Sequence, residues 1–309
     1  MSYELILWIA FNLFILLMLA LDLGVFQRKT HAVSVKEALI WSCVWIALAL
    51  AFNLFVYFDF GKQKALEFLT GYLLEKSLSV DNIFVFVLLF SYFKVPELYQ
   101  HKVLFWGVLG ALILRAALIA IGALMIAKFH WVIYIFGAFL VYTGFRMAKQ
   151  NDEDIHPEDN ILIRTFKKFF PVTHDYHGEK FFVKIDGRKV ATPLFIVLLA
   201  IEFTDLVFAF DSIPAIFAVT KDPFIVYTSN IFAILGLRSL YFALAGIIHK
   251  FHYLKVGLSM ILIFIGMKML AADLYKVPIS YSLGVIALIL TASVVLSVLR
   301  PKVREESET

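Results

Sequence analysis

Two short stretches of the chain repeat one pattern of oxygen-bearing side chains. Residues 75–83 read EKSLSVDNI and residues 205–213 read DLVFAFDSI, so each has an acid, five intervening residues, an aspartate and a small polar residue. Oxygen ligands without sulfur or imidazole suit Mg²⁺, Ca²⁺ or Mn²⁺ and suit Cu⁺ or Zn²⁺ poorly. The pattern predicts a divalent-cation site with Glu75, Asp81, Asn82, Glu202, Asp205 and Asp211 as ligands and Ser79, Thr204 and Ser212 in support.

The segments that hold these stretches are strongly apolar. Hydrophobic residues make up 61% of the chain, charged residues 17%, and the mean hydropathy is +0.86. A soluble domain has roughly 45–50% apolar residues, so this composition excludes a disordered chain, a nucleic-acid-binding module and an ordinary soluble enzyme. Because a bilayer-spanning helix needs roughly 20 apolar residues, we predict an all-α integral membrane protein with about nine spans: 4–26, 38–58, 66–90, 103–127, 130–147, 193–219, 225–248, 255–273 and 278–299.

Lysine and arginine are distributed unequally between the two sets of loops. With the N-terminus outside and the C-terminus inside, 19 of them fall on the inner side and 5 on the outer side. Positive residues are enriched in the cytoplasmic loops of membrane proteins, so we expect this orientation. The first span has no basic region before it and no small-residue cleavage site after it, and we expect it to remain as an anchor.

Further landmarks recur in the same order in the two halves of the chain. A Leu-Gly pair followed by an arginine occurs at Leu109-Gly110 and Arg115, and again at Leu235-Gly236 and Arg238. A glycine near the end of a later span occurs at Gly144 and again at Gly266. A repeat unit of three spans must enter the membrane from opposite sides in its two copies. We therefore predict an inverted 3+3 repeat, whose interface near the midplane is where transporters bind their substrates.

This repeat divides the chain into five parts. These are two N-terminal helices (1–65), the first three-helix repeat (66–147), a cytoplasmic loop (148–192), the second repeat (193–273), and the last helix with a cytoplasmic tail (274–309). In the loop, the Asp186-Gly187 pair between two apolar and basic runs predicts a β-hairpin. We interpret His174 and His177 as exposed polar residues, and a weak metal patch is the alternative.

Five acids and two arginines fall near the middle of predicted spans. A charged side chain at the bilayer centre costs roughly 2.5–3.5 kcal/mol, so these groups must face one another or a wet cavity. Glu202 and Asp205 share a helical face, but Asp205 and Asp211 are rotated by about 120° on a straight helix. We expect either local unwinding, which Pro214 favours by removing the hydrogen bond to the Phe210 carbonyl, or ligands from the other half of the repeat.

The same charges also admit a purely structural interpretation. The acids would then pair with Arg115, Arg238 and Lys76 as buried ion pairs that fix the register of the helices. Five acids against three cations leave a surplus of negative charge, which favours a cation site. Asp22, at the inner end of the first span, is either a membrane-edge residue or part of an inner gate.

The stretches at 75–82 and 202–238 resemble the TerC family of bacterial membrane proteins, and its Alx-type branch most closely. The resemblance covers nearly the whole chain and implies a LysE-like transporter architecture in the bacterial inner membrane. It links the chain to manganese export and to metal, alkaline-pH and tellurite stress, and implies that the metal path is lined by Glu75, Asp81, Glu202, Asp205 and Asp211. The family also carries a redox-modulator label, for which the single cysteine, Cys43, and the lack of a cofactor motif give no physical support.

These observations favour an exporter of a divalent cation that exchanges the ion for protons at crowded carboxylates. Mn²⁺ is the favoured ion. The metal ion is then a transported substrate, and we expect no cofactor and no nucleic-acid partner. We expect the chain to lie in the lipid bilayer, and its protein partners are unknown. We expect no enzyme, because the Gly-x-Gly-Asp and Gly-x-Ser-Gly motifs of intramembrane proteases are missing. The alternative is a non-transporting membrane protein of the metal, alkaline and tellurite stress response, acting as a sensor or scaffold for protein partners that the sequence does not identify.

Overall fold

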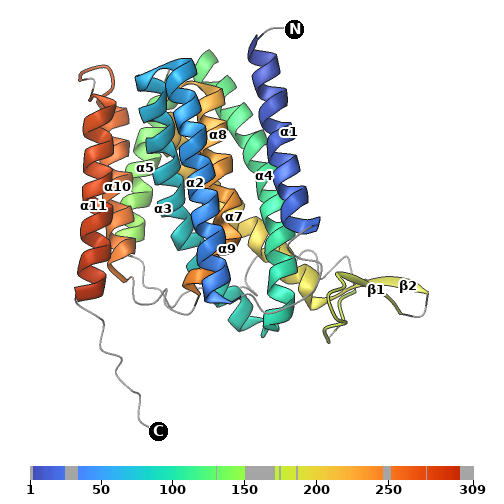
Figure 1. Cartoon of the computed structure of the whole chain (residues 1–309). Helices are drawn as coiled ribbons and strands as arrows, with labels where there is room; N and C mark the ends of the chain where they lie inside the picture. The colour runs from blue at the N-terminus through green and yellow to red at the C-terminus, as the bar shows by residue number, and fades with distance from the viewer. Residues whose placement is uncertain are drawn as a thin grey trace.

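Long helices run side by side along one axis, and a small β-hairpin leaves one end of the bundle (Figure 1). The computed structural model describes residues 3–24, 34–129, 131–149, 171–173, 175–185, 187–245, 252–275 and 277–299, without the side chains of residues 21–24, 81 and 252. We call the end that carries the hairpin the hairpin end. α1 begins at the opposite end, which we call the vestibule end, and α11 ends at the hairpin end.

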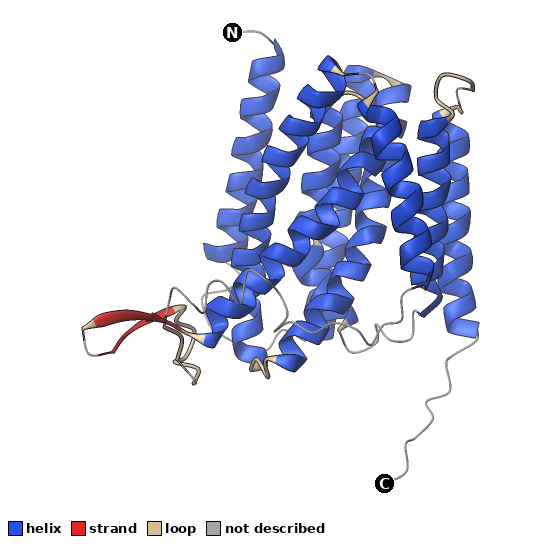
Figure 2. Cartoon of the chain, turned by 180° about the vertical axis from the view of Figure 1, so that it is seen from behind, coloured by secondary structure: helices blue, strands red, loops and turns tan. Residues whose placement is uncertain are grey.

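Helices account for nearly all of the regular structure in the described residues. The chain order is α1 (Tyr3–Gly24), α2 (Val35–Phe60), α3 (Lys62–Tyr92), α4 (Glu97–Lys128), α5 (Val132–Lys149), β1 (Phe182–Ile185), β2 (Arg188–Ala191), α7 (Pro193–Phe217), α8 (Pro223–Leu235), α9 (Leu237–Leu244), α10 (His252–Leu270) and α11 (Ile279–Leu299). Figure 2 shows the same bundle from behind, with the strands confined to the hairpin.

Eight helical segments of the described chain are long and apolar enough to cross a membrane. α3 is not among these eight, because charged residues such as Glu75 and Lys76 interrupt its apolar sequence. Its 31 residues nevertheless span about 46 Å at 1.5 Å per residue, more than the hydrocarbon core needs. α3 packs against α2, α7, α8, α9 and α11, so protein surrounds much of it. The prediction of an all-α membrane protein is confirmed.

Several helix boundaries follow from local sequence. Ser34 precedes α2, and its hydroxyl accepts a hydrogen bond from the Glu37 backbone N–H at 3.2 Å. Asp222 caps α8 in the same way and is followed by Pro223, which suits the first helical position. Gly61 joins α2 to α3 at φ 89°, a left-handed conformation that favours glycine.

The predicted unwinding near Pro214 is wrong. α7 continues as one helix from Pro193 to Phe217 with Pro214 inside it. The predicted span 225–248 is interrupted instead, because α8 ends at Leu235 and α9 begins at Leu237, with Gly236 between them. The acids of α7 therefore lie on a continuous helix, and any ligands they share must come from other helices.

The helix packing is compatible with the predicted inverted repeat, which stays a prediction. α3 packs on α8 and α4 packs on α7, while α5 packs on α10. A Cβ on Gly144 of α5 would lie 2.8 Å from the Ser259 carbonyl oxygen, and one on Gly266 of α10 would lie 2.7 Å from the Gly137 carbonyl oxygen. Both 137 and 259, and 144 and 266, are 122 positions apart, so each contact maps onto the other when the halves are exchanged.

Aromatic rings fill the space between α1, α2, α3 and α8. Phe52 of α2 lies 5.1 Å from Phe232 and 5.4 Å from Phe68, measured between ring centroids, and Phe11 of α1 lies 5.8 Å from Phe232. Between helices in lipid, close packing rather than removal from water supplies most of the attraction. These contacts hold the two N-terminal helices against the rest of the bundle.

Candidate functional site

A buried arginine joins the two acidic stretches at the centre of the bundle. Arg115 of α4 forms an ion pair through Nη1 with Oε1 of Glu75 on α3, and its Nη2 lies 2.7 Å from Oδ1 of Asp205 on α7. Its Nε donates to Asp205 Oδ2 at 3.1 Å, so the guanidinium holds Asp205 with two hydrogen bonds. The side chains of Arg115 and Glu75 are 1% exposed and that of Asp205 is 3% exposed. We call Glu75, Arg115 and Asp205 the central triad.

The central triad combines both expectations from the sequence. Acids of the first and second halves meet at one point, and a buried cation bridges them. Two carboxylates and one guanidinium carry a formal charge of −1 when all are ionised. A buried charge without compensation is costly, so the triad retains an attraction for a further cation.

Several oxygens around the central triad have no hydrogen-bond partner within the described structure. They are Glu75 Oε2, Ser79 Oγ, Asn82 Oδ1 and Ser212 Oγ, and each of these residues is 1% exposed. The Asn82 side-chain amide does donate to Asp205 Oδ1, at 3.4 Å. Buried polar groups are normally paired, and exceptions in a native structure point to a missing water or ion.

A cavity of about 10 Å³ lies among these orphaned oxygens. Its lining includes Glu75, Asn82, Arg115, Asp211 and Ser212, from α3, α4 and α7. This is about the space that one water molecule requires. A single ion without its hydration shell therefore fits the volume, and a hydrated ion does not.

Asp211 borders this cavity but is held from another side. It is half-buried, and the hydroxyl of Thr143 on α5 donates a hydrogen bond to its carboxylate, with Arg146 near by. Asp81 lies on α3 beside Asn82, and its side chain is outside the described structure. Among the described side chains, no three of His, Cys, Asp and Glu converge as a metal site. Arg115 lies between Glu75 and Asp205 in this conformation, which we call the closed conformation.

Glu202 lies apart from the central triad, one helical turn before Asp205. Its carboxylate packs directly onto Gly110 of α4, where any Cβ would overlap it, and its Oε2 has no hydrogen-bond partner in the described structure. Lys76 of α3 has a related position. Its Nζ lies 2.5 Å from where a Cβ of Gly236 would be, and donates to the Ala233 carbonyl at 3.4 Å. The two glycines that correspond in the repeat are therefore each covered by a charged side chain of opposite sign.

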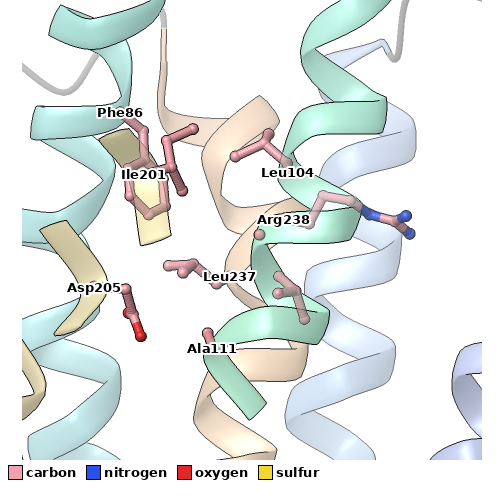
Figure 3. Close-up of a pocket in the computed structure, with 9 residues that line it drawn as sticks. Phe86, Leu104, Ala111, Ile201, Asp205, Leu237 and Arg238 are labelled. Carbon is pink, nitrogen blue, oxygen red and sulfur yellow. The ribbon is translucent and has the colours of Figure 1, made fainter. Parts of the chain in front are cut away.

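Arg238, the counterpart of Arg115 in the repeat, is placed differently. It borders a second cavity of about 10 Å³ that Asp205, Leu237, Ala111 and Ile201 also line. Figure 3 shows Asp205 at one edge of this pocket and the Arg238 guanidinium pointing away from it. The arginine that joins Glu75 to Asp205 is thus Arg115.

The remaining predicted residues contribute less to this centre. The Thr204 hydroxyl donates to the Ala200 carbonyl of its own helix at 2.7 Å, so its hydrogen is committed locally. Asp22 lies on α1, and its side chain is outside the described structure. In the loop, His177 is exposed, while His174 is not among the described residues.

The sequence analysis missed a second ionic cluster at the vestibule end. Lys64 Nζ lies 3.0 Å from Glu67 Oε2 and 3.1 Å from Asp222 Oδ2, and we call these residues the outer triad. Thr220 donates to Glu67 Oε2 at 2.5 Å. The i, i+3 spacing of Lys64 and Glu67 predicts an ion pair on one helical face. Nothing in the sequence around them indicates that Asp222 also binds Lys64.

The outer triad lines a large cavity. This vestibule has a volume of about 940 Å³ and lies between the beginning of α3, the ends of α7 and α10, and the residues before α8 and α11. Lys268 of α10 also lines it and donates to the Ser282 hydroxyl of α11 at 3.0 Å. The vestibule is wide enough for hydrated ions, unlike the central cavity.

Comparison with known proteins identifies the chain's relatives. Residues 60–305 match the family described as "Integral membrane protein TerC family". A protein of Myxococcus xanthus, "Uncharacterized membrane protein STKORF319", is 55% identical over 96% of this chain and 93% of its own length. "Putative membrane-bound redox modulator Alx" of Escherichia coli (strain K12) is 48% identical over 94% of each chain, and a protein of the same name from Photorhabdus laumondii is 48% identical over 95% of this chain and 94% of its own. No solved structure matches.

Proposed function

Because the chain belongs to the TerC family of integral membrane proteins, we propose that it exports a divalent cation across the bacterial inner membrane, with Mn²⁺ as the favoured ion. The hairpin end then faces the cytoplasm, and the vestibule end faces outward. The ion is the transported substrate, and protons that bind the acids after the ion leaves provide the return current.

One observation carries this proposal. Carboxylates from the two halves of the chain converge on the same buried point, and orphaned oxygens surround a cavity of about 10 Å³ beside them. These groups are carboxylate, amide and hydroxyl oxygens, the ligands that Mg²⁺ and Mn²⁺ accept. The cluster keeps a negative surplus after Arg115 is counted, which a structural ion pair alone does not need.

Arg115 acts in this proposal as a resident counter-cation. In the closed conformation its guanidinium neutralises part of the charge of Glu75 and Asp205. An arriving divalent cation competes for the same carboxylates, and the helices must shift to admit it because the present cavity has room for a single small particle. Movement of one repeat against the other is the general way in which such transporters open to each side.

The redox label carried by several relatives has little support in the residues of this chain. Cys43 is the single cysteine of the sequence, and it is exposed on α2 rather than near the central triad. One thiol forms no internal disulfide.

Transport into proteoliposomes tests the proposal directly. Purified protein should move Mn²⁺ into vesicles that contain a Mn²⁺-quenched dye. The flux should be faster when the vesicle interior is more acidic than the outside, because protons then leave as Mn²⁺ enters. Asp211→Asn and Asp81→Asn should abolish this flux and the manganese tolerance of cells. Asp211 lines the cavity, and Asp81 is the aspartate of the matching stretch in the first half of the chain. Asp59→Asn, an exposed carboxylate bonded to Tyr3 near the vestibule end, should transport like the unmodified chain.

The alternative of a sensor or scaffold gives a different result. Protein that folds and binds Mn²⁺ but never moves it, with or without a proton gradient, would overturn the exporter proposal. Normal manganese tolerance in both well-expressed aspartate variants would overturn the proposed metal path. Comparing Mg²⁺ and Ca²⁺ in the same vesicles establishes which ion is preferred.

A further inference from the structure

The hairpin extends sideways from the bundle rather than covering the ends of the helices. Figures 1 and 2 show β1 and β2 lying beyond the outline of the helices, roughly at right angles to the bundle axis. A strand of four residues is about 13 Å long at 3.3 Å per residue. Between the hairpin and the level of the vestibule end, outside the bundle, Figure 1 shows no helix of the described chain. In a membrane, lipid occupies that space.

The base of the hairpin is fixed at the level where a membrane helix begins. Thr192 alone separates β2 from α7, and its buried hydroxyl donates to the Lys180 carbonyl at 2.7 Å. The rings of Phe182 and Phe195 lie 4.5 Å apart, and the Tyr176 hydroxyl donates to the Phe93 carbonyl at the end of α3, at 2.7 Å. These contacts from two sides hold the hairpin at the bilayer surface.

The two faces of the hairpin differ in chemistry. Val183 pairs with Val190, and Ile185 pairs with Arg188, so these four side chains share one mainly apolar face. Ile185 is 42% exposed. An apolar face of this kind, beside the bundle and at the membrane surface, is typical of interfacial segments that insert among headgroups.

The opposite face carries unbalanced positive charge. Lys184 and Lys189 lie directly opposite each other in the register, both exposed, and neither strand contains an acid. Like charges in this position destabilise a hairpin. Lys180, before β1, and Arg188, on the mainly apolar face, are also exposed, and Asp186 between the strands is the one acid in residues 180–191. A nearby anionic surface would offset this repulsion.

We propose that the hairpin lies on the cytoplasmic surface of the bilayer and binds anionic phospholipid headgroups. Val183, Ile185 and Val190 face the acyl boundary, and the four cations lie within a Debye length of the phosphates. This inference is independent of the transported ion, but it rests on the orientation in the proposed function, with the hairpin end in the cytoplasm, and on the membrane span of α7. Its consequence is an anchor that fixes the start of α7, the helix that carries Asp205, relative to the membrane surface.

A fluorescent label at the hairpin tests the proposal in the full-length protein. Cys43→Ser removes the single native thiol, and Ile185→Cys then accepts an environment-sensitive dye. The protein is placed in nanodiscs of phosphatidylcholine alone or with increasing phosphatidylglycerol. We expect a blue shift of the emission and quenching by headgroup-proximal spin-labelled lipid, both growing with the anionic fraction and weakening in high salt.

Two charge variants make the test specific. The triple change Lys184→Gln, Arg188→Gln and Lys189→Gln should abolish the dependence on anionic lipid. A matched control, Lys36→Gln, Lys94→Gln and Lys149→Gln, removes as many exposed cations from the hairpin end but leaves the hairpin intact, and should retain it. If the dye reports an aqueous environment in every nanodisc, the proposal is overturned. A hairpin that docks a soluble protein instead of lipid would give this result. Equal loss in both triples, or a shift without dependence on phosphatidylglycerol, also overturns it.

Discussion

The centre and the vestibule end of the bundle each hold two carboxylates bridged by one cation. In the central triad, Arg115 joins Glu75 to Asp205, and all three side chains are 1–3% exposed. In the outer triad, Lys64 joins Glu67 to Asp222, with side-chain exposures of 32%, 9% and 27%. Both clusters connect the first half of the chain to the second, so they have the same charge and the same topology but different access to water.

This difference decides what each cluster can do. A solvated ion pair gains little because water already stabilises its charges, and salt screens what remains. A buried pair has no such substitute, so removing one partner leaves a charge that nothing compensates. The central triad is therefore a strong constraint on how the helices pack. The outer triad, part of which is exposed to solvent, is a weaker contact at the edge of the vestibule.

Arg115→Gln should have the largest effect. Loss of the guanidinium leaves Glu75 and Asp205 buried and close together without a counter-charge, which costs about 3–5 kcal/mol. We expect a much lower thermal-unfolding midpoint in detergent and reduced yield. Lys128→Gln, an exposed change at the end of the same helix, should unfold like the unmodified chain.

Two further variants separate charge from shape in the central triad. Arg115→Lys keeps the charge but loses the fork that holds Asp205 with two hydrogen bonds, so it should recover part of the stability. Arg115→Gln combined with Glu75→Gln and Asp205→Asn removes every charge and should recover more, without transport. An Arg115→Gln protein as stable as the unmodified chain would show that the triad is hydrated, and the contrast with the outer triad would fail.

Gly110→Ala should have an intermediate effect and tests how tightly the centre is packed. A Cβ at Gly110 would overlap the Glu202 carboxylate, so either that side chain or α7 must move. Overpacking of this kind costs about 1–3 kcal/mol. The unfolding midpoint should fall, whereas Gly284→Ala, where a Cβ meets nothing within 4 Å, should not lower it through a clash. Equal behaviour of the two variants would contradict close packing at Glu202.

Lys64→Met should have the smallest effect on stability. A partly exposed pair contributes about 0–1 kcal/mol, and that contribution falls with ionic strength. We expect a small drop in the unfolding midpoint at low salt that disappears in concentrated KCl. Lys62→Met, two residues earlier and exposed, provides the control. A large, salt-independent loss would show that the outer triad is as dry as the central one.

The site could be predicted from the sequence in part. Because charge inside a membrane must find a partner, the sequence predicts that the acids face one another or a wet cavity, or pair with Arg115, Arg238 and Lys76. In the structure Arg115 joins Glu75 to Asp205. The break expected near Pro214 does not occur, since the helix tolerates the proline when its neighbours pack around it. Whether these oxygens bind a metal stays a prediction.

Asymmetry between the repeats was beyond the sequence. Arg115 and Arg238 look equivalent in the two copies, yet the first bridges two carboxylates and the second points away from the Asp205 pocket. Side-chain direction depends on which helix is adjacent and on how far one repeat is shifted against the other. Neither quantity is encoded locally around an arginine.

The sequence by itself determined the helical membrane fold, because apolar length and the cost of unpaired backbone groups in lipid leave few alternatives. It also located the acids that need partners. Only the tertiary structure decided which cation those acids received, which oxygens remained unpaired, and that Asp222 closes a cluster with Lys64 at the vestibule end. Contacts between residues on different helices, such as Arg115 and Asp205 at 90 positions apart, depend on how the helices pack, and local periodicity does not contain that information.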